Sequence, residues 1–410
     1  MRILHVNLNL VEGGLERVMA LQCAGLAARG HDNLVLHGRP ERPDCAVDGA
    51  RCACVPWVTH VRCPDLGDRL ADVRELLRRE RPDVALLNHV FCPELVDLLT
   101  RELPCVRFVH DVELVCCGRK MLNRRTPSGA PEPCLFPLGP LCQARAYIHR
   151  CMPRDPRIGL PLITARWRIV RMHRSRTRMA APSGYIRGVL LHNGFAPARV
   201  QVIEHFVPTP HGEPSGPQFP ADAPPLVLFA ARVNKGKGLD VLLAALAHLP
   251  RPVRLVVAGD GPDLPAMREL AERLGVAASV EFAGWMDRME LEALRARAAL
   301  AVVPSVCPES FALVGLEAMA HALPVVGSDS GGITQWLEHG VTGLLVPPRD
   351  AAALAGAMDA ILADQKLARS MGRAGYAAVR GRFTPERHLD ALEALLALAA
   401  SEGAYAGRAS

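Results

Sequence analysis

Short apolar segments alternate along the chain with longer amphipathic segments. In the first half the apolar segments read ILHVNL, NLVLHG, DVALLN and CVRFVH, and residues 68–80 and 92–101 have helical spacing. This alternation is typical of parallel strands joined by helical crossovers. The sequence therefore predicts a parallel α/β domain over residues 1–206. An insertion at about 112–160 interrupts the pattern, which resumes with MAAPS and VQVIEHF.

The same alternation restarts after a linker. Residues 207–225 are so rich in Pro and Gly that neither a helix nor an interior strand is expected there. Over residues 226–383 the segments PLVLFAAR, RLVVAGD, VEFAG, ALAVVPS, PVVGSD and TGLLVPP are separated by helix-length stretches. The prediction is an α/β protein with two Rossmann-like, doubly wound domains whose ligands bind in a shared central cleft. The helix and tail at 384–410 fit either domain equally well.

Length and composition support this organisation. A chain of 410 residues exceeds the size of most single cores, and 50% hydrophobic with 22% charged residues excludes a disordered or coiled-coil protein. The first apolar run is broken by His5, Asn7 and Asn9, so a buried strand is expected there and not a signal peptide. No apolar run reaches the roughly 18 residues of a membrane span. We therefore expect a cytoplasmic protein whose thirteen cysteines are reduced.

The positive charge is concentrated in one region. The net charge is +6, but residues 118–178 hold fourteen Lys or Arg against Glu132 and Asp155, which makes this segment +12. Within it, an apolar helical stripe is surrounded by arginines, and two interpretations stay open: docking on an anionic membrane surface, or packing of the stripe on the core. Nucleic-acid binding is not expected, because the segment lacks interleaved aromatic residues. The stripe is Ile163, Trp167 and Val170, and the arginines are Arg166, Arg168, Arg171, Arg174, Arg176 and Arg178.

The segment PESFALVGLEAMAHALPVVGSDSGG at 308–332 carries two glutamates, Glu309 and Glu317, with seven residues between them. Two glutamates on a helix are often simply solvated. Glu317, however, lies in the otherwise apolar stretch FALVGLEAMA, where a carboxylate is costly without a partner or a ligand. The pattern therefore favours a binding site.

This segment resembles the E-x7-E motif of the retaining, GT-B-fold glycosyltransferases of group 1, a family 4-like group. The resemblance implies that Glu317 accepts hydrogen bonds from the donor ribose and that Glu309 faces the transferred hexose. It also implies that the backbone amides of Phe311, Ala312 and Leu313 meet the donor. We expect that no cofactor is required for catalysis.

The chain departs from the family pattern at two places. Ser310 and Ala312 stand where relatives often have glycine beside the phenylalanine, and Thr334-Gln335 stand where many have Pro-Glu.

A basic turn, AARVNKGKGLD at 230–240, follows the first apolar segment of the second domain. It resembles the family's arginine and lysine pair, here Arg232 and Lys237, which would hold the pyrophosphate and stabilise the departing nucleoside diphosphate without Mg²⁺. Lys235 competes by charge alone, and a solvated basic turn is the alternative.

The first domain contributes two weaker signals. Gly13 and Gly14 follow the first strand and open a helix, so their backbone can approach donor phosphates, although a plain strand-to-helix turn is the alternative. His110-Asp111 ends CVRFVH and resembles the family histidine on the acceptor side of the reaction centre. A packing role for His110, or a site at Asn88-His89 instead, stays open.

Five cysteines, Cys116, Cys117, Cys134, Cys142 and Cys151, cluster in the insertion. The last four are a candidate tetrahedral structural zinc site, but their spacing fits no standard zinc finger, and reduced thiols are the alternative.

The resemblance implies retaining transfer of a hexosyl-type residue from a UDP-, GDP- or ADP-sugar to a glycan or lipid-linked acceptor in polysaccharide or glycolipid synthesis. In this front-face reaction a donor phosphate oxygen takes the acceptor's proton. The enzyme is expected in the cytoplasm, peripheral at the inner face of the membrane. A nucleotide-sugar epimerase and a catalytically silent nucleotide-sugar-binding protein stay open as alternatives. A dehydrogenase is disfavoured, because no G-x-G-x-x-G follows the first strand.

Overall fold

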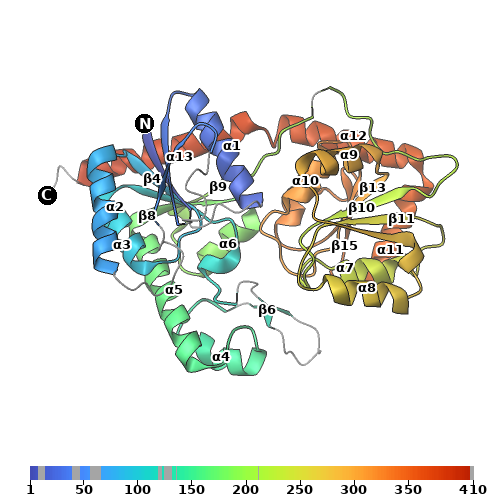
Figure 1. Cartoon of the computed structure of the whole chain (residues 1–410), viewed down its shortest axis with the longest axis horizontal. Helices are drawn as coiled ribbons and strands as arrows, with labels where there is room; N and C mark the ends of the chain where they lie inside the picture. Colours follow the sequence, from blue (N-terminus) through green and yellow to red (C-terminus); the bar gives the residue numbers. More distant parts are fainter. Residues whose placement is uncertain are drawn as a thin grey trace. The chain divides into compact units, whose positions relative to one another are not determined.

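The computed structural model describes residues 1–7, 14–38, 47–55, 66–118, 122–123, 132–134, 136–210 and 212–406. The chain divides into two compact units, the first formed by Met1–Glu204 and Glu386–Ser410 and the second by His205–Pro385. Each unit contains its own parallel sheet (Figure 1). The described part of residues 207–225 forms no helix or strand and belongs to the second unit. The prediction of an α/β chain with two Rossmann-like domains is confirmed.

The sheet of the first unit is parallel in every described strand pair. Across the sheet the strands are β3 (Arg51–Cys54), β2 (Asp32–His37), β1 (Arg2–Val6), β4 (Val84–Leu87), β5 (Cys105–Phe108), β8 (Thr177–Ala181) and β9 (Val200–Val202). Each predicted apolar segment forms one of them. The sequence analysis missed β3, because RCAC is half polar and only partly buried. The strands of this unit end at one edge, where His89 and His110 follow β4 and β5.

Helices cover both faces of this sheet. One apolar core is shared by the sheet with α2, α3, α5 and α6, and another by the sheet with α1 and α13. The helices are α1 (Gly14–Ala28), α2 (Leu66–Glu80), α3 (Pro93–Glu102), α4 (Cys142–His149), α5 (Pro156–Arg176), α6 (Gly184–His192) and α13 (Pro385–Ala406). None of the helices in the described residues is long and apolar enough to cross a membrane.

The last helix, α13, packs on the first unit, although it follows the second unit in sequence (Figure 1). Its leucines share a core with Ile3 and Phe108. Helix α1 approaches it closely, since a Cβ on Gly25 would lie 2.4 Å from a methyl group of Leu389. His388 Nδ1 donates to the carbonyl oxygen of Glu204 at 2.6 Å, and burial lowers the pKa of His388 to about 4, so the imidazole is neutral. The structure thus assigns the C-terminal helix to the N-terminal domain.

The predicted insertion forms a small layer of its own. It contains the 3-10 turn η1 (Val112–Leu114), the antiparallel pair β6 (Leu122–Asn123) and β7 (Glu132–Pro133), helix α4 and the start of α5. Helix α4 lies against α5, because Gly159 leaves space for Gln143: a Cβ at Gly159 would lie 2.1 Å from the Gln143 side-chain oxygen. The Gln143 amide nitrogen donates to the carbonyl oxygen of Arg154 at 3.0 Å, which fixes the connection between the two helices.

The second unit is a parallel sheet of the same kind. Across the sheet the strands are β12 (Val280–Gly284), β11 (Arg254–Ala258), β10 (Leu226–Ala230), β13 (Leu300–Val303), β14 (Val325–Ser328) and β15 (Gly343–Val346). The helices are α7 (Leu239–Leu246), α8 (Leu264–Arg273), α9 (Arg288–Arg297), α10 (Leu313–Met319), α11 (Ala351–Ala363) and α12 (Gln365–Gly381). The order reverses between β10 and β13, so the loops after these two strands meet at the place where such sheets bind ligands.

Candidate functional site

The loop after β10, which carries Arg232 and Lys237, is fixed to the loop after β13. The carbonyl oxygen of Gly236 accepts hydrogen bonds from the backbone amides of Val306 and Cys307 at 3.0 and 3.2 Å. Gly238 has φ +72°, and a Cβ there would lie 1.9 Å from the carbonyl oxygen of Pro304. Glycine is therefore required at this position. The two loops form one structure at the carboxyl ends of neighbouring strands.

Lys237 and Glu309, which are 72 residues apart, are brought together by this packing. Lys237 Nζ donates to Glu309 Oε1 at 2.7 Å, and the Ser305 hydroxyl donates to the same oxygen at 2.6 Å. The Glu309 side chain is only 13% exposed, so its charge is stabilised by these two donors and not mainly by water. The predicted basic turn and the predicted acidic motif are thus parts of one site.

The glycine-rich loop after β14 joins the same site through the backbone of Glu309. The carbonyl oxygen of Glu309 accepts a hydrogen bond from the amide of Gly332 at 2.6 Å. Gly331 has φ +61°, and a Cβ on it would lie 2.3 Å from that oxygen. Thr334 and Gln335, where many relatives have Pro-Glu, continue this loop in the short 3-10 helix η4 (Gly332–Gln335).

Unlike Lys237, Arg232 and Lys235 have side chains that are exposed to solvent. Neither makes a hydrogen bond or an ion pair with a side chain that the structure describes. The backbone amide of Lys235 donates to Asp263 at 2.7 Å, so that residue contributes to the turn through its main chain. The Arg232 guanidinium is accordingly available to an anion, while Lys237 already has a carboxylate partner.

Glu317 has a partner that the sequence analysis missed. Arg295, on α9, donates to a Glu317 carboxylate oxygen through Nη2, and the two side chains are only 4% and 14% exposed respectively. The pair explains how a carboxylate is tolerated in the apolar helix α10. Arg295 lies 22 residues away in the sequence RMELEALRARA, where it looks like any other arginine of a charged surface helix.

The start of α10 has an unusual backbone. Ala312, which precedes it, has φ 61° and ψ 67°, the left-handed conformation that favours glycine. Phe311 is buried, with its ring edge-to-face with His205 at 5.4 Å between centroids, so only its backbone can reach a ligand. Trp336 holds that backbone by donating its indole N–H to the Phe311 carbonyl oxygen. The amides of Phe311, Ala312 and Leu313 donate to no residue that the structure describes.

Ala312→Gly is expected to stabilise the protein. The left-handed conformation costs an alanine about 1–2 kcal/mol, so the substitution should raise the free energy of unfolding by about 1 kcal/mol after the extra chain entropy of glycine is subtracted. Thermal unfolding checks this. Ala360→Gly, at an exposed position within α11, is the matched control and should lower stability by about 1 kcal/mol. Equal losses of thermal stability in both variants would show that the backbone of Ala312 is not strained.

In the first unit, His110 is oriented by Asn88. His110 Nε2 lies 2.9 Å from Asn88 Oδ1, to which it donates, and the imidazole stacks on Phe108 with 4.6 Å between ring centroids. Asn88 follows β4 and His110 follows β5, so the structure brings the two sequence candidates at this edge into direct contact. His110 is half-buried, and its acceptor-side role stays a prediction.

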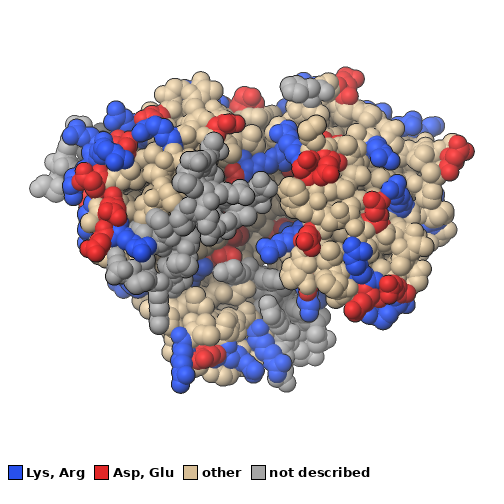
Figure 2. Space-filling view, viewed as in Figure 1, with Lys and Arg blue, Asp and Glu red and all other residues tan. Residues whose placement is uncertain are grey.

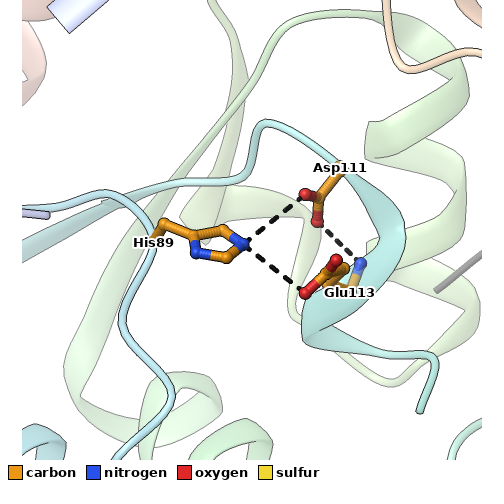
Figure 3. Close-up of side chains that lie close together, drawn as sticks. All are labelled: His89, Asp111 and Glu113. Atoms are coloured by element: carbon orange, nitrogen blue, oxygen red, sulfur yellow. Dashed lines mark hydrogen bonds and ion pairs between the residues drawn. The ribbon is translucent and has the colours of Figure 1, made fainter. Parts of the chain in front are cut away.

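Three titratable side chains, His89, Asp111 and Glu113, meet in the loops after β4 and β5 (Figure 3). His89 Nε2 lies 3.4 Å from Glu113 Oε2 and 3.9 Å from Asp111 Oδ2, and Asp111 accepts a hydrogen bond from the Glu113 amide at 2.7 Å. Burial and the nearby Glu113 raise the pKa of Asp111. Their ligand atoms all lie within 4.8 Å of one another, a spacing that a metal ion can use.

Two arginines lie beside this trio. Arg166 Nη2 is 3.7 Å from Glu113 Oε2, and its guanidinium lies 3.3 Å from the centroid of the Phe91 ring. Arg107 is buried, and burial together with the positive charge of Arg166 lowers its pKa to about 9. The guanidinium groups offset the charge of Asp111 and Glu113, so a divalent cation would add positive charge to a site that is already balanced. The arrangement favours an acid-base cluster over a metal centre.

The cysteines of the insertion share one neighbourhood. Cys117, Cys142 and Cys151 all pack against one small apolar cluster formed by Ala146, Met152 and Ile163. Burial raises the pKa of Cys117 to about 12. Cys117, Cys134, Cys142 and Cys151 are free thiols. Among the described residues, the group with the spacing of a metal site is the histidine and carboxylate trio, and zinc at the cysteines stays a prediction.

The predictions for Gly13 and Gly14 and for the apolar stripe of α5 have different outcomes. Gly13 lies outside the described residues, and Gly14 is the first residue of α1. Of the predicted apolar stripe, Ile163 and Val170 are 4% and 1% exposed and pack on the protein core, so these two side chains do not face a membrane. Trp167 is 41% exposed.

Comparison with protein families gives two matches. A Glycosyltransferase Family 4 model matches residues 12–210, and a Glycosyl transferases group 1 model matches residues 216–378. The division between them falls close to the division between the two units after Glu204.

Individual relatives match over less than half of this chain. The lipopolysaccharide core biosynthesis glycosyltransferase LpsE of Rhizobium meliloti is 37% identical over 180 residues, covering 43% of this chain and 51% of that protein. The GDP-mannose-dependent alpha-(1-6)-phosphatidylinositol monomannoside mannosyltransferase of Mycobacterium tuberculosis is 36% identical over 182 residues, covering 42% and 46%. In these alignments the chain spans about half the length of the curated relatives it matches.

Solved structures share the fold over almost the whole chain. HepE of Anabaena in complex with UDP and glucose has a TM-score of 0.70 at 18% identity and covers 97% of this chain and 99% of its own. WaaG, a glycosyltransferase involved in lipopolysaccharide biosynthesis, has a TM-score of 0.65 at 19% identity and covers 95% and 98%. The chain therefore resembles Glycosyltransferase Family 4 over its first unit and Glycosyl transferases group 1 over its second, and it has the GT-B fold of the solved glycosyltransferases.

Proposed function

We propose that this protein is a retaining glycosyltransferase that moves a hexosyl-type residue from a nucleotide-diphospho-sugar to a glycan or lipid-linked acceptor. The observation that carries the proposal is the contact of Lys237 and Ser305 with Glu309, where Lys237 lies on the same loop as the exposed Arg232. This arrangement places two cations and one carboxylate at the carboxyl ends of β10 and β13. It suits a ligand that has both a diphosphate and a hydroxyl-rich sugar.

Each of these residues has a distinct task in the proposed reaction. Departure of a nucleoside diphosphate increases negative charge on the leaving oxygen, and Arg232 with Lys237 stabilises that charge. Glu309 accepts hydrogen bonds from sugar hydroxyls and favours the positive charge that develops at the anomeric carbon. Glu317, held by Arg295, accepts from the ribose. The protein then contributes orientation and charge stabilisation, and a donor phosphate oxygen takes the acceptor's proton.

The two alternatives, an epimerase and a silent binding protein, make different demands on the site. An epimerase needs acid and base groups at the sugar, and in the second unit Glu309 is engaged by Lys237 and Ser305. A silent binding protein needs the same site without turnover. Product analysis separates all three.

The experiment uses the full chain with UDP-glucose, GDP-mannose and ADP-glucose, in the presence of a metal chelator. The panel holds one donor for each of the three expected nucleotides; one named relative is GDP-mannose-dependent, and the HepE structure contains UDP and glucose. The sugar released from the donor, or transferred to an added glycan, is read by NMR. Retention of the donor's anomeric configuration supports the proposal. Inversion contradicts the retaining mechanism, an epimerised nucleotide-sugar indicates an epimerase, and binding without turnover indicates the silent protein.

A further inference from the structure

A pocket lies at the amino-terminal edge of the sheet of the first unit, beside the last turns of α13. Its volume is about 520 Å³, which suits a small ligand. Strand β5 begins in this pocket at Cys105, whereas His110 follows the opposite end of the same strand. The pocket is therefore separate from the candidate reaction site. Its wall comes from the ends of α3 and α5, the start of β5, Arg178 of β8, Arg199 of the 3-10 turn η2 (Pro197–Arg199), and Ala399 and Glu402 of α13.

Arginines outnumber acids among the residues that line this pocket, with four arginines against two glutamates. Figure 2 shows basic and acidic side chains interspersed over the part of the first unit that carries α2 and α3. At the pocket, by contrast, two of the arginines share one acid. Arg176 Nη1 donates to Asp97 Oδ1 at 2.7 Å, and Arg101 Nε lies 3.0 Å from Asp97 Oδ2. The other two arginines of the pocket are Arg178 and Arg199.

The Arg178 guanidinium is fixed in a geometry that binds oxyanions. Its side chain is only 16% exposed, and its Nη1 donates to the carbonyl oxygen of Ala198 at 3.3 Å. Its Nε donates to Glu402 Oε2 at 2.9 Å, and its Nη2 donates to Glu402 Oε1. Guanidinium groups bind carboxylates and phosphates through two-point contacts of this kind. The Glu402 carboxylate thus shows which chemistry Arg178 recognises.

Arg199 lies beside this contact and has an unused guanidinium. Arg178 holds the carbonyl oxygen of Ala198, the residue directly before Arg199. The hydrogen bonds from Arg178, together with the charges of Arg178 and Arg199, lower the pKa of Glu402. Within the described residues the Arg199 side chain makes no hydrogen bond, and it is only partly exposed. The pocket therefore offers a second cation to a ligand that reaches Arg178.

Glu402 is placed where a ligand can displace it. It lies near the end of α13, and its side chain is 46% exposed. An ion pair with such an exposed partner contributes little to stability, so its loss costs the fold little. An anion with more charge than a carboxylate can therefore replace Glu402 without disturbing the rest of the helix.

We propose that this pocket binds a small phosphate-bearing metabolite, whose phosphate is held by Arg178 and Arg199 in place of the Glu402 carboxylate. A phosphate monoester carries close to two negative charges and has three acceptor oxygens, so it can contact both guanidinium groups at once. The rest of the molecule lies along Leu103, Pro104 and Ala399, which also line the pocket. The inference rests on the first unit alone and does not depend on the proposed activity.

Isothermal titration calorimetry with glucose 6-phosphate and with inorganic phosphate tests the proposal. The parent protein for this experiment is the full chain with Arg232→Ala/Lys237→Ala, so that the cations of the second unit cannot bind the phosphate. We expect both probes to bind at millimolar concentration and to compete with each other. Glucose alone should not bind, because it has no charge for the arginines to recognise.

Two pocket variants are expected to change the affinity for glucose 6-phosphate in opposite directions. Arg199→Gln should weaken binding about tenfold, since it removes one hydrogen-bonded charge from the phosphate. Glu402→Gln should tighten binding severalfold, because the competing carboxylate loses its charge. The matched control is Arg74→Gln, which removes an exposed guanidinium of α2 and should bind as the parent protein does. A folding defect cannot produce a gain in one pocket variant and a loss in the other.

Three outcomes would overturn the proposal. The first is a parent protein that binds neither glucose 6-phosphate nor inorganic phosphate. The second is an equal loss of affinity in Arg199→Gln and Arg74→Gln, which would indicate binding to surface charge in general. The third is an unchanged affinity in Glu402→Gln, which would show that the phosphate does not take the place of the Glu402 carboxylate.

Discussion

Lys237→Ala is expected to lower the rate of sugar transfer by about 10²- to 10³-fold, the usual cost of removing one fixed group that stabilises transition-state charge. The lysine donates to Glu309 at 2.7 Å in the protein without donor, so it is held where a diphosphate would meet it. The Ser305 hydroxyl still donates to Glu309 at 2.6 Å in the variant, so the fold of the loop should survive. Steady-state kinetics with the donor identified by product analysis measure the effect, and the loss should be mainly in kcat.

Lys235→Ala is the matched control for this prediction. Lys235 lies two residues away on the same turn and is exposed, and its structural contact is made by its backbone amide. Its removal should change transfer by less than about twofold, as for a surface charge without a fixed partner. An equal loss of transfer rate in both variants would show that the turn acts through its net charge. An unchanged rate in Lys237→Ala would show that Lys237 does not take part in the reaction.

Glu317→Ala is expected to destabilise the second unit even in the absence of any ligand. The substitution removes the carboxylate from Arg295, whose side chain is only 4% exposed, and breaking such a buried pair costs about 3 kcal/mol. The melting temperature should fall by roughly 10 °C for a unit of this size. Differential scanning calorimetry without nucleotide measures it. An unchanged melting temperature would mean that the Glu317–Arg295 contact contributes little.

A second variant separates the structural role of Glu317 from its proposed role in binding. Glu317→Leu/Arg295→Met replaces both charges with apolar groups, which often leaves stability unchanged or improves it. This double variant should regain most of the lost melting temperature, but it should show no stabilisation by nucleotide. If nucleotide still stabilised the double variant, the ribose contact assigned to Glu317 would be wrong.

The strand and helix pattern predicted most of the fold because apolar strands and amphipathic helices differ in period. It failed for β3, which is short and half polar. It also failed where the domain to which a helix belongs depends on contacts between residues distant in sequence. The C-terminal helix is the clearest case. Its place on the first unit depends on pairs such as Gln22 with His388, whose side-chain nitrogens lie 2.9 Å apart across 366 residues of sequence.

The candidate site was only partly predictable from sequence. Lys237 and Glu309 belong to recognisable motifs that the sequence analysis assigned to donor binding, but their direct contact was not predicted. The role of Arg295 as the partner of Glu317 was not predicted. Its helix is rich in charged residues, and nothing in the sequence distinguishes a buried arginine from a solvated one. The trio of His89, Asp111 and Glu113 was missed for a related reason, since only folding places the residues after β4 beside those after β5. The left-handed φ of Ala312, by contrast, was indicated by the sequence, because relatives often have glycine at this position.

The position of α13 also sets the order in which the chain can complete its structure. The second unit is one continuous stretch of sequence, so it can finish folding as soon as residues 205–385 have been synthesised. The first unit cannot, because the sheet face formed by Ile3, Val106 and Phe108 is covered by leucines of α13, which follow the second unit in sequence. The N-terminal domain therefore completes its core only after the second unit has been synthesised, and until then this apolar face of its sheet lacks the helix that covers it.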